Sequence, residues 1–209
     1  VRMLTEAERR GDEFAALNSV SASLSGERDL KWVLSMIVNS VKQLMNTPSS
    51  FIYLYNDTLE ILELSITSGV GFPAGLTLKM GEGMAGRVAE TRKPLLVKNY
   101  RKWANRLNKL DEINYSSVLE VPMLFGGMLI GVLGVAEVNN EIRVFTEQDE
   151  RLLSLFAAQG ASAVYNARLF DAIQSSNKEL DHLYRASDAL IGAVASNIPD
   201  LCQRIAHVV

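Results

Sequence analysis

Cysteine and histidine, the side chains that most often bind transition metals or act as nucleophile and base, are confined to one end of this chain. The single cysteine is Cys202, and the two histidines are His182 and His207. The segment from Asp29 to Phe170 has neither type, which argues there against zinc, histidine-ligated haem, a cysteine nucleophile and a Ser-His-Asp triad. We therefore expect no catalytic residue, no metal and no cofactor in that segment. A lone cysteine makes no internal disulfide, which fits a reducing compartment.

Basic and aromatic residues are interleaved in the polar segment from 98 to 116. Such a group can bind an anionic or aromatic ligand through ion pairs and stacking, with the segment acting as a lid. Alternatively, the charges lie on a solvated surface while the aromatic side chains anchor the segment to the core. We expect a short helix around residues 103–110. The residues concerned are Lys98, Tyr100, Arg101, Lys102, Trp103, Arg106 and Lys109.

The stretch from Leu76 to Val97 predicts a strand, a glycine turn, a short helix and a second strand. Gly81 and Gly83 permit positive φ in a sharp turn, and Gly86 lets another group approach the helix backbone closely. The helix start offers free N–H groups that could receive an anion. The alternative is a tight turn with a structural role only.

The other hydrophobic patterns predict an α+β domain with an antiparallel sheet. Helices are expected at residues 3–24 and 30–45, and hairpins at 51–67 and 118–138. Pro122 cannot donate a sheet hydrogen bond, so we expect its N side to face outward or to lie at an edge. A long helix is expected to begin with a capping box at Thr146 and to continue well past residue 170. The N- and C-terminal helices should cover one face of the sheet, and the short helix with the lid the other.

This order of elements resembles the GAF family of small-molecule-sensing domains. The resemblance covers roughly residues 29–170 and rests on GEGMAGRVAETRKPLLV, a loop, and the strands SVLEVPM and GMLIGVLGV. It implies a GAF/PAS-like fold with a signalling and dimerisation helix at 1–27, a GAF domain at 28–170 and a connector helix at 171–209. Relatives that reduce methionine sulfoxide or hold a bilin use domain cysteines, which this segment lacks.

The end of the chain resembles its beginning. Near the start, an apolar helix pattern ends with Ser21-x-x-Leu24 and is followed by a break and a second apolar stripe. The same succession begins again with Ser187-x-x-Leu190. This suggests that 171–209 includes the truncated start of a second GAF repeat. The alternative is that any two amphipathic helices align this well.

Asn139, Phe145, Asp149 and Glu150 match the Asn-Lys-Phe-Asp-Glu signature of cyclic-nucleotide-binding GAF domains. Asn140 stands where that signature has lysine, so its lysine–aspartate ion pair cannot form, and whether cyclic nucleotides bind stays open. The alternative is structural, with these residues forming a turn, a helix cap and first-turn acids.

Strand parity predicts which face of the sheet meets a ligand. On the last strand, Leu133, Val135 and Glu137 alternate with Gly134 and Ala136. Because small side chains suit close packing by long helices, we expect Gly134 and Ala136 to face the terminal helices. The opposite face then supplies the candidate ligand-binding residues: Phe51, Tyr53, Met84, Trp103, Ser117, Val135 and Glu137.

Composition is that of an ordinary globular protein, with 48% hydrophobic and 22% charged residues among 209. A net charge of -3 gives no reason to expect a nucleic-acid or anionic-membrane surface. No apolar run reaches the length of a membrane span and no signal-peptide pattern is present, so we expect a cytoplasmic location and no membrane contact.

Apolar and polar residues at three-and-four spacing along the last helix predict a coiled coil, and so a parallel homodimer through the terminal helices. The sequence favours a sensory module of a multidomain sensor kinase or cyclase, of the two-component type, in which dimeric helices pass the state of an unknown small-molecule ligand to an output domain. The alternative is a structural dimerisation module with no ligand, and we do not expect an enzyme. The helix positions are Leu152, Leu155, Gln159, Ser162, Asn166, Leu169, Ile173, Ser176, Leu180 and Leu183.

Overall fold

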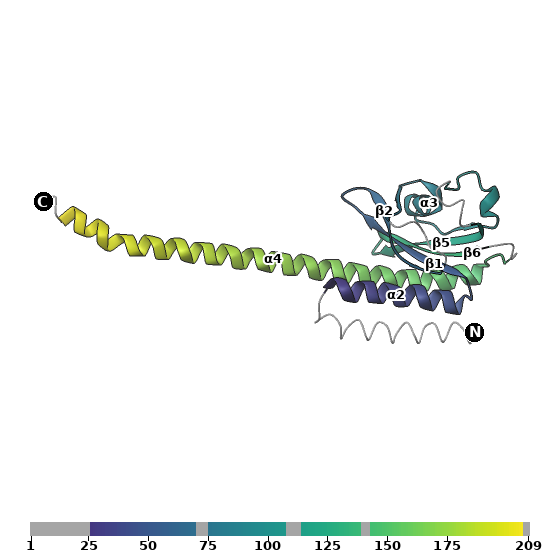
Figure 1. Ribbon diagram of the computed structural model, residues 1–209, viewed down its shortest axis with the longest axis horizontal. Helices are drawn as coiled ribbons and strands as arrows, with labels where there is room; N and C mark the ends of the chain where they lie inside the picture. Colours follow the sequence, from purple (N-terminus) through teal and green to yellow (C-terminus); the bar gives the residue numbers. More distant parts are fainter. Residues whose placement is uncertain (1–25, 70–74, 108–113, 139–142, 207–209) are drawn as a thin grey trace. The chain divides into compact units, whose positions relative to one another are not determined.

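The computed structural model of the chain describes residues 26–69, 75–107, 114–138 and 143–206. It divides into two compact units, residues 1–167 and residues 168–209 (Figure 1). The helix expected at 3–24, together with Asn139, Asn140 and Lys109, lies outside the described residues. In the second unit, the described backbone is the C-terminal part of one helix.

Within the described residues, the first unit is built on a six-stranded antiparallel sheet with the order β3-β2-β1-β6-β5-β4. Both expected hairpins are confirmed, since β1 pairs with β2 and β5 pairs with β6. The strands are β1 (Ser49–Asn56), β2 (Ile61–Ser68), β3 (Thr77–Lys79), β4 (Leu95–Val97), β5 (Tyr115–Phe125) and β6 (Met128–Val138). The short strand β4 pairs with β5 only as far as Glu120, which is opposite Leu95. Pro122 lies past this point, where β5 itself forms the edge of the sheet, as expected.

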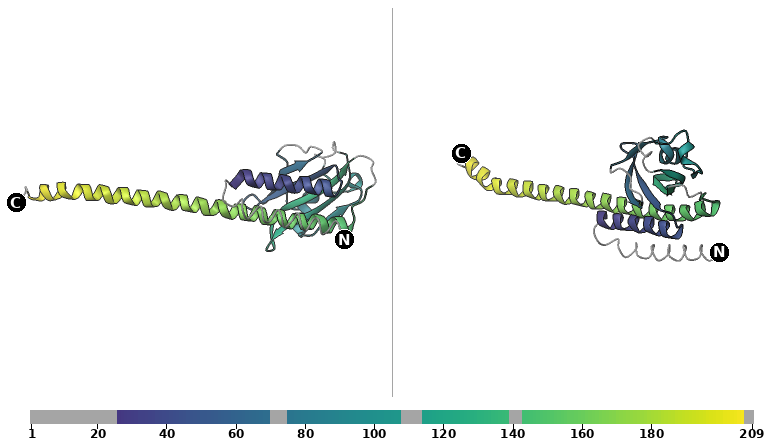
Figure 2. Two further views of the ribbon diagram at one scale, coloured as in Figure 1. Left: turned by 90° about the horizontal axis from the view of Figure 1, so that it is seen from below. Right: turned by 45° about the vertical axis from the view of Figure 1, so that its right-hand side comes forward.

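Helices cover both faces of this sheet. In the first unit, α2 (Gly26–Leu44) and the beginning of α4 (Glu147–Ala206) lie side by side on one face, as the view from below shows (Figure 2). The helix α3 (Gly83–Thr91) lies on the other face (Figure 1). The α+β architecture expected from the sequence is confirmed. No helix among the described residues combines the length and the apolar character that crossing a membrane requires.

The expected short helix of the 98–116 segment is misplaced. The structure has a 3-10 turn, η1 (Tyr100–Lys102), and the described residues from Trp103 to Leu107 are not helical. The side chain of Asn99 accepts a hydrogen bond from the Lys102 backbone N–H at 3.3 Å. This local cap starts the turn three residues earlier than the apolar pattern suggests.

Each face of the sheet has its own hydrophobic core, and the predicted assignment of β6 to these faces is wrong. Leu133 and Val135 pack with the long helices, whereas Val132 and Ala136 pack on the α3 face. The reason lies at Gly134. A Cβ atom there would come within 2.3 Å of the Phe51 ring, so the small residue makes room for an aromatic side chain of β1 and not for a helix.

The start of α4 follows the predicted capping box. The Thr146 hydroxyl accepts a hydrogen bond from the Asp149 N–H at 3.3 Å, and the Asp149 carboxylate accepts one from the Thr146 N–H at 2.7 Å. Further along, the expected break after Leu190 is absent, because the backbone stays helical through Gly192 to Ala206. One glycine costs a helix about 1 kcal/mol and does not end it by itself. The proposed second repeat stays a prediction.

Candidate functional site

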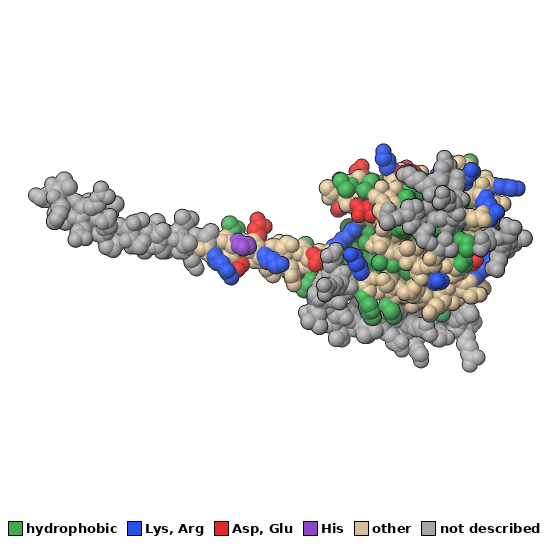
Figure 3. Space-filling model, viewed as in Figure 1, with side chains coloured by type: hydrophobic (Ala, Val, Ile, Leu, Met, Phe, Trp, Pro, Cys, Tyr) green, Lys and Arg blue, Asp and Glu red, His purple; other side chains and the backbone are tan. Residues whose placement is uncertain are grey.

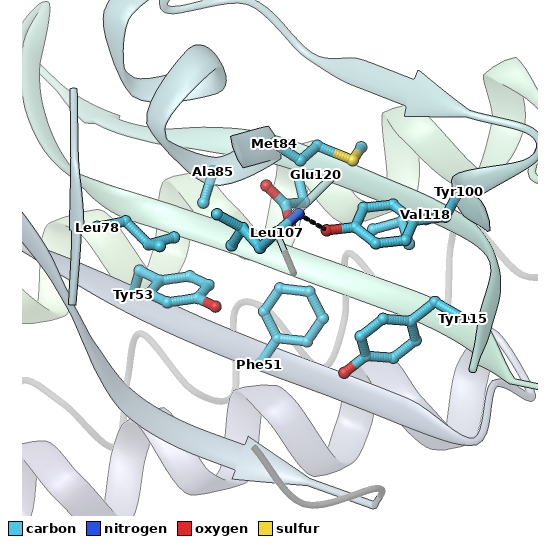
Figure 4. A pocket seen from close by; sticks show the side chains of 10 residues that line it. All are labelled: Phe51, Tyr53, Leu78, Met84, Ala85, Tyr100, Leu107, Tyr115, Val118 and Glu120. Carbon is cyan, nitrogen blue, oxygen red and sulfur yellow. Dashed lines mark hydrogen bonds between the residues drawn. The ribbon is translucent and has the colours of Figure 1, made fainter. Parts of the chain in front are cut away.

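A hollow lies between the sheet and α3, with about 280 Å³ of unfilled space including its mouth. Its floor is formed by β1 and β5, and its roof by α3 together with residues of η1 and the segment after it (Figure 4). Most of that space is the open mouth, because the enclosed part is about 10 Å³, room for about one water molecule. The lining residues are Phe51, Tyr53, Leu78, Met84, Ala85, Tyr100, Leu107, Tyr115, Val118 and Glu120.

The glycine turn positions α3 over this hollow. Gly81 and Gly83 have φ of 78° and 63°, as the sequence predicts. A Cβ on Gly86 would lie 2.4 Å from the Lys79 carbonyl oxygen, so the group that approaches this helix closely is the chain's own turn. The Glu82 carboxylate accepts a hydrogen bond from the Lys79 N–H at 2.9 Å. These contacts support the tight-turn alternative over an anion site at the helix start.

Among the described residues that line the hollow, Glu120 has the one carboxyl group. It is 4% exposed, and its Oε2 atom has no hydrogen-bond partner among the described residues. Burial raises the pKa of the Glu120 carboxyl to about 8, because the ionised form loses its hydration. A buried carboxyl in this condition costs stability unless a ligand or water satisfies it.

Aromatic rings surround this carboxyl. Phe51 packs edge-on against Tyr53 with centroids 5.8 Å apart, and Tyr100 packs edge-on against Tyr115 at the same separation. The Tyr100 hydroxyl accepts a hydrogen bond from the Leu107 N–H at 3.2 Å, the dashed line in Figure 4. Burial, followed by the nearby Glu120, raises the pKa of the Tyr53 hydroxyl, and burial raises that of Tyr115. Both hydroxyls therefore stay neutral at physiological pH.

The basic side chains of the 98–107 segment do not line the hollow. Lys98, Arg101 and Lys102 are exposed, whereas Tyr100 is buried and Trp103 is half-buried against the α3-side core. Figure 3 shows Lys and Arg side chains projecting outward at this side of the first unit. The arrangement supports the alternative in which the charges are solvated and the aromatic side chains anchor the segment.

Of the seven side chains predicted to contact a ligand, three line the hollow: Phe51, Tyr53 and Met84. Trp103 lies next to it, 5.9 Å from the Tyr100 ring between centroids. The remaining three lie on the opposite face of the sheet from the hollow. Val135 belongs to the core under the long helices. Ser117 and Glu137 are paired across β5 and β6, two residues along from the pair Leu119 and Val135, and so they face the same side of the sheet as that pair. That these residues contact a ligand stays a prediction.

Sequence reasoning missed Glu120, the most informative residue of the site. The available signal was a lone charged residue within SVLEVPM, a strand that is otherwise apolar apart from Ser117. On an amphipathic strand such a residue faces solvent, but β5 is covered on both faces, and Glu120 points to the hollow with Val118.

The residues that match the cyclic-nucleotide signature lie away from the hollow, at the start of α4. Phe145 is buried in the core under the helices.

Asp149 forms an ion pair with Arg143 at 3.3 Å, so a basic partner for this aspartate comes from a position that the sequence did not indicate. Arg143 also approaches Glu137 at 3.7 Å and donates hydrogen bonds to the carbonyl oxygens of Met45 and Asn46. In the described residues these groups tie the start of α4 to the end of α2, and Glu150 completes the first helical turn by donating to the Thr146 carbonyl.

The hollow offers groups that can bind a small molecule. It combines one buried carboxyl, neutral tyrosine hydroxyls and apolar walls, without an imidazole or thiol between residues 29 and 170. The part of the chain that the structure describes has no group of three or more His, Cys, Asp or Glu side chains placed to hold a metal ion.

Comparison with known proteins identifies relatives for the first unit. Residues 27–164 match the family model described as GAF domain. The chain is 34% identical over 103 residues to the probable 3',5'-cyclic phosphodiesterase pde-5 of Caenorhabditis elegans, a match that covers 48% of this chain and 14% of that protein. It is 26% identical over 137 residues to the Nif-specific regulatory protein of Azospirillum lipoferum, covering 62% of this chain and 22% of that protein. The chain thus spans less than a quarter of either relative.

Solved structures share the fold. The GAF domain from a phosphoenolpyruvate-protein phosphotransferase of Coxiella burnetii superimposes with a TM-score of 0.64 at 21% identity, covering 78% of this chain and 96% of that one. The free methionine-R-sulfoxide reductase from Neisseria meningitidis, solved with its substrate, gives a TM-score of 0.60 at 17% identity, covering 75% of this chain and 88% of that one. At these identities the likeness shows the fold alone.

Proposed function

This chain belongs to the GAF domain family, and on that premise we propose that it is the sensory, regulatory module of a larger signal-transduction protein of the sensor-kinase or cyclase type. A small molecule occupies the hollow between β1, β5 and α3, and α4 passes its presence to an output domain. The observation that carries the proposal is the hollow itself, in which apolar and aromatic side chains lie around one buried carboxyl whose Oε2 atom has no hydrogen-bond partner among the described residues. Such a combination is typical of small-molecule sites.

The relatives support a regulatory role. A phosphodiesterase and a Nif-specific regulatory protein each resemble this chain over a small part of their length, as expected of a module that is joined to different outputs. Their names do not transfer a ligand. A cyclic phosphate is a poor match for the hollow, because the described lining residues offer it a carboxyl and no cation.

We propose that the module acts as a parallel homodimer through α4. In the second unit, four apolar side chains follow one another at intervals of four, seven and three residues, which places them on one side of the helix. Each is about half exposed or more: Leu169, Ile173, Leu180 and Leu183. A stripe of this kind along a helix is stabilised by a second copy of itself, and its polar interruptions keep the association weak enough to switch. The alternative function is a structural dimerisation module in which the hollow stays without a ligand.

We propose no catalytic activity for the domain. One structural neighbour is a methionine sulfoxide reductase, but residues 29–170 of this chain have no cysteine to serve as a thiol reductant.

Native mass spectrometry of freshly purified protein tests the proposal. We expect a species heavier than the chain by the mass of one small molecule, which is lost on denaturation. A panel of metabolites should also raise the melting temperature, since a ligand at a hundred times its Kd contributes about 2.7 kcal/mol. A dimer with neither bound mass nor a ligand-dependent melting shift would instead establish the structural alternative.

A further inference from the structure

The buried carboxyl of Glu120 lacks what such groups ordinarily have. Buried acidic side chains are nearly always paired with a base or held by hydrogen bonds. Among the described residues, Oε2 of Glu120 has no such partner and no basic side chain lines the hollow. A strand with two covered faces would gain stability from an apolar residue at this position. Glu120 therefore points to a ligand that supplies the missing positive charge or hydrogen-bond donor.

The surroundings of Glu120 narrow the chemistry of that ligand. Phe51, Tyr53, Tyr100 and Tyr115 place aromatic rings around the same space, and Met84 contributes a polarisable side chain from α3 (Figure 4). Aromatic faces attract cations, most strongly those that are poorly hydrated, such as alkylated ammonium groups. A bare metal ion needs several oxygen, nitrogen or sulfur ligands, and the described residues offer no such group.

We propose that the hollow binds a small organic ammonium ion, whose charge pairs with the Glu120 carboxylate and whose carbon substituents pack against the surrounding rings. This assignment rests on the proposed function, because it names the ligand class of the same site. Because the enclosed part of the hollow is about 10 Å³, the ammonium ion occupies the mouth as well, and the lining side chains shift to admit it.

The residues around Glu120 define the pH dependence of binding. Among the described residues, the ionisable groups that line the hollow with it are Tyr53 from β1, Tyr100 from η1 and Tyr115 from β5. β3 and α3 contribute uncharged Leu78, Met84 and Ala85. Since burial raises the pKa of Glu120 to about 8, the free protein carries the proton at neutral pH. A permanent cation binds the ionised form and displaces that proton. Its affinity should therefore rise about tenfold per pH unit below pH 8 and level off above it.

The test is calorimetric titration of the whole chain with choline and with 3,3-dimethylbutan-1-ol, its uncharged isostere. Choline carries a fixed charge, so any change of its affinity with pH comes from a titrating group of the protein. We expect choline to bind, to release close to one proton per site at pH 7 as judged from buffers of different ionisation enthalpy, and to bind at least about tenfold more tightly than the alcohol. The titration is repeated with n-butylammonium against n-butanol, so that the result does not depend on one head group.

Two variants locate the effect. Glu120→Gln keeps the size of the side chain and removes its charge, and it should lose the preference for choline. Glu137→Gln is the matched control, since Glu137 is also buried, at 2% exposed, but lies on the opposite face of the sheet beside Arg143. It should bind choline as the wild type does. If Glu120→Gln does not fold, the isostere comparison and the pH profile of the wild type decide the question without it.

The outcomes separate the inference from the function on which it rests. Equal binding of choline and the alcohol, an affinity independent of pH from 6 to 8, or unchanged choline binding by Glu120→Gln would overturn the ammonium assignment. If neither cation binds but native mass spectrometry finds another molecule that competes for the hollow, the assignment is wrong and the sensory function stands. If nothing binds at all, both are wrong.

Discussion

Glu120 and Gly134 lie directly opposite each other on β5 and β6, and a Cβ atom added to Gly134 would come within 3.0 Å of the Glu120 Cγ atom. The same atom would come within 2.3 Å of the Phe51 ring, which lies over the glycine. The absence of a side chain at 134 therefore determines where both the ring and the carboxyl sit, and hence the shape of the hollow.

Gly134→Ala should distort the hollow while leaving the sheet in place. The added methyl group displaces the Phe51 ring and the Glu120 side chain, and we expect a loss of about 1–3 kcal/mol in the free energy of unfolding together with the loss of ligand binding. Denaturant titration and calorimetry measure the two effects.

Gly160→Ala on α4 is the matched control for Gly134→Ala. Its Cβ would meet the terminal methyl group of Met123, which can move aside, on the opposite face of the sheet. We expect unchanged ligand binding and equal or slightly greater stability, by up to about 1 kcal/mol, from the better helix propensity of alanine. Equal loss of binding in both glycine variants would show that the effect is not local to the hollow.

The Glu120 carboxyl should make the protein less stable as pH rises. Its pKa is about 8 in the folded chain, above the ordinary value of 4.5, so the folded state holds a proton that the unfolded state has released between these values. The free energy of unfolding then falls by up to about 1.4 kcal/mol per pH unit in this window and is level above pH 8.

Glu120→Gln should remove this dependence and become the more stable protein at pH 8. Urea titrations of both proteins from pH 5 to pH 8 measure the difference. Parallel stability profiles for wild type and variant would contradict the assigned burial of the carboxyl.

Trp103 should report occupation of the hollow. It contacts Tyr100, which lines the hollow, and Arg87 lies 5.9 Å above its ring centroid. The chain's other tryptophan, Trp32, is 51% exposed on α2. In a Trp32→Phe variant, a ligand in the hollow should shift the emission, whereas a Trp103→Phe variant that retains Trp32 should show no change.

Replacing both Leu169 and Ile173 by Asp should give monomers, because the two carboxylates would face their copies across the proposed α4 seam. Multi-angle light scattering at several concentrations measures the mass. The matched control adds the same two charges off the seam, as Gln174→Asp with Ser175→Asp, and should leave the mass unchanged. A wild-type monomer at micromolar concentration would refute the dimer directly.

Arg143→Met should loosen the junction between α2 and α4. The change removes ion pairs with Asp149 and Glu137 and the hydrogen bonds to the Met45 and Asn46 carbonyl oxygens. Since the arginine side chain is 35% exposed, solvent screening limits the expected loss to about 1–2 kcal/mol.

Arg151→Met removes a fully solvated pair, with Glu147 at 3.9 Å, and serves as the control for Arg143→Met. We expect a change within about 0.5 kcal/mol by denaturant titration. A loss as large as that of Arg143→Met would argue against a special role for the α2–α4 junction.

The sequence by itself determined the local elements of this protein. Glycine at 81 and 83, the capping box at Thr146 and Asp149, and the two apolar hairpins predicted the turn, the helix start and the antiparallel sheet correctly, because each depends on residues that are near in sequence. The lack of cysteine and histidine from residue 29 to residue 170 restricted the available chemistry in the same way.

Only the tertiary structure decided which face of the sheet holds the hollow. The alternation of side chains along a strand defines two faces but does not say which of them meets the helices. On β6 almost every residue is buried, so no alternation of polar and apolar residues distinguishes the two faces. Long-range packing decides which face is which: Phe51 packs against Gly134, α3 lies on the face of Glu120, and α4 lies on the face of Val135. For the same reason the partner of Asp149 became visible only in three dimensions, since Arg143 reaches it from a loop whose path no sequence pattern specifies.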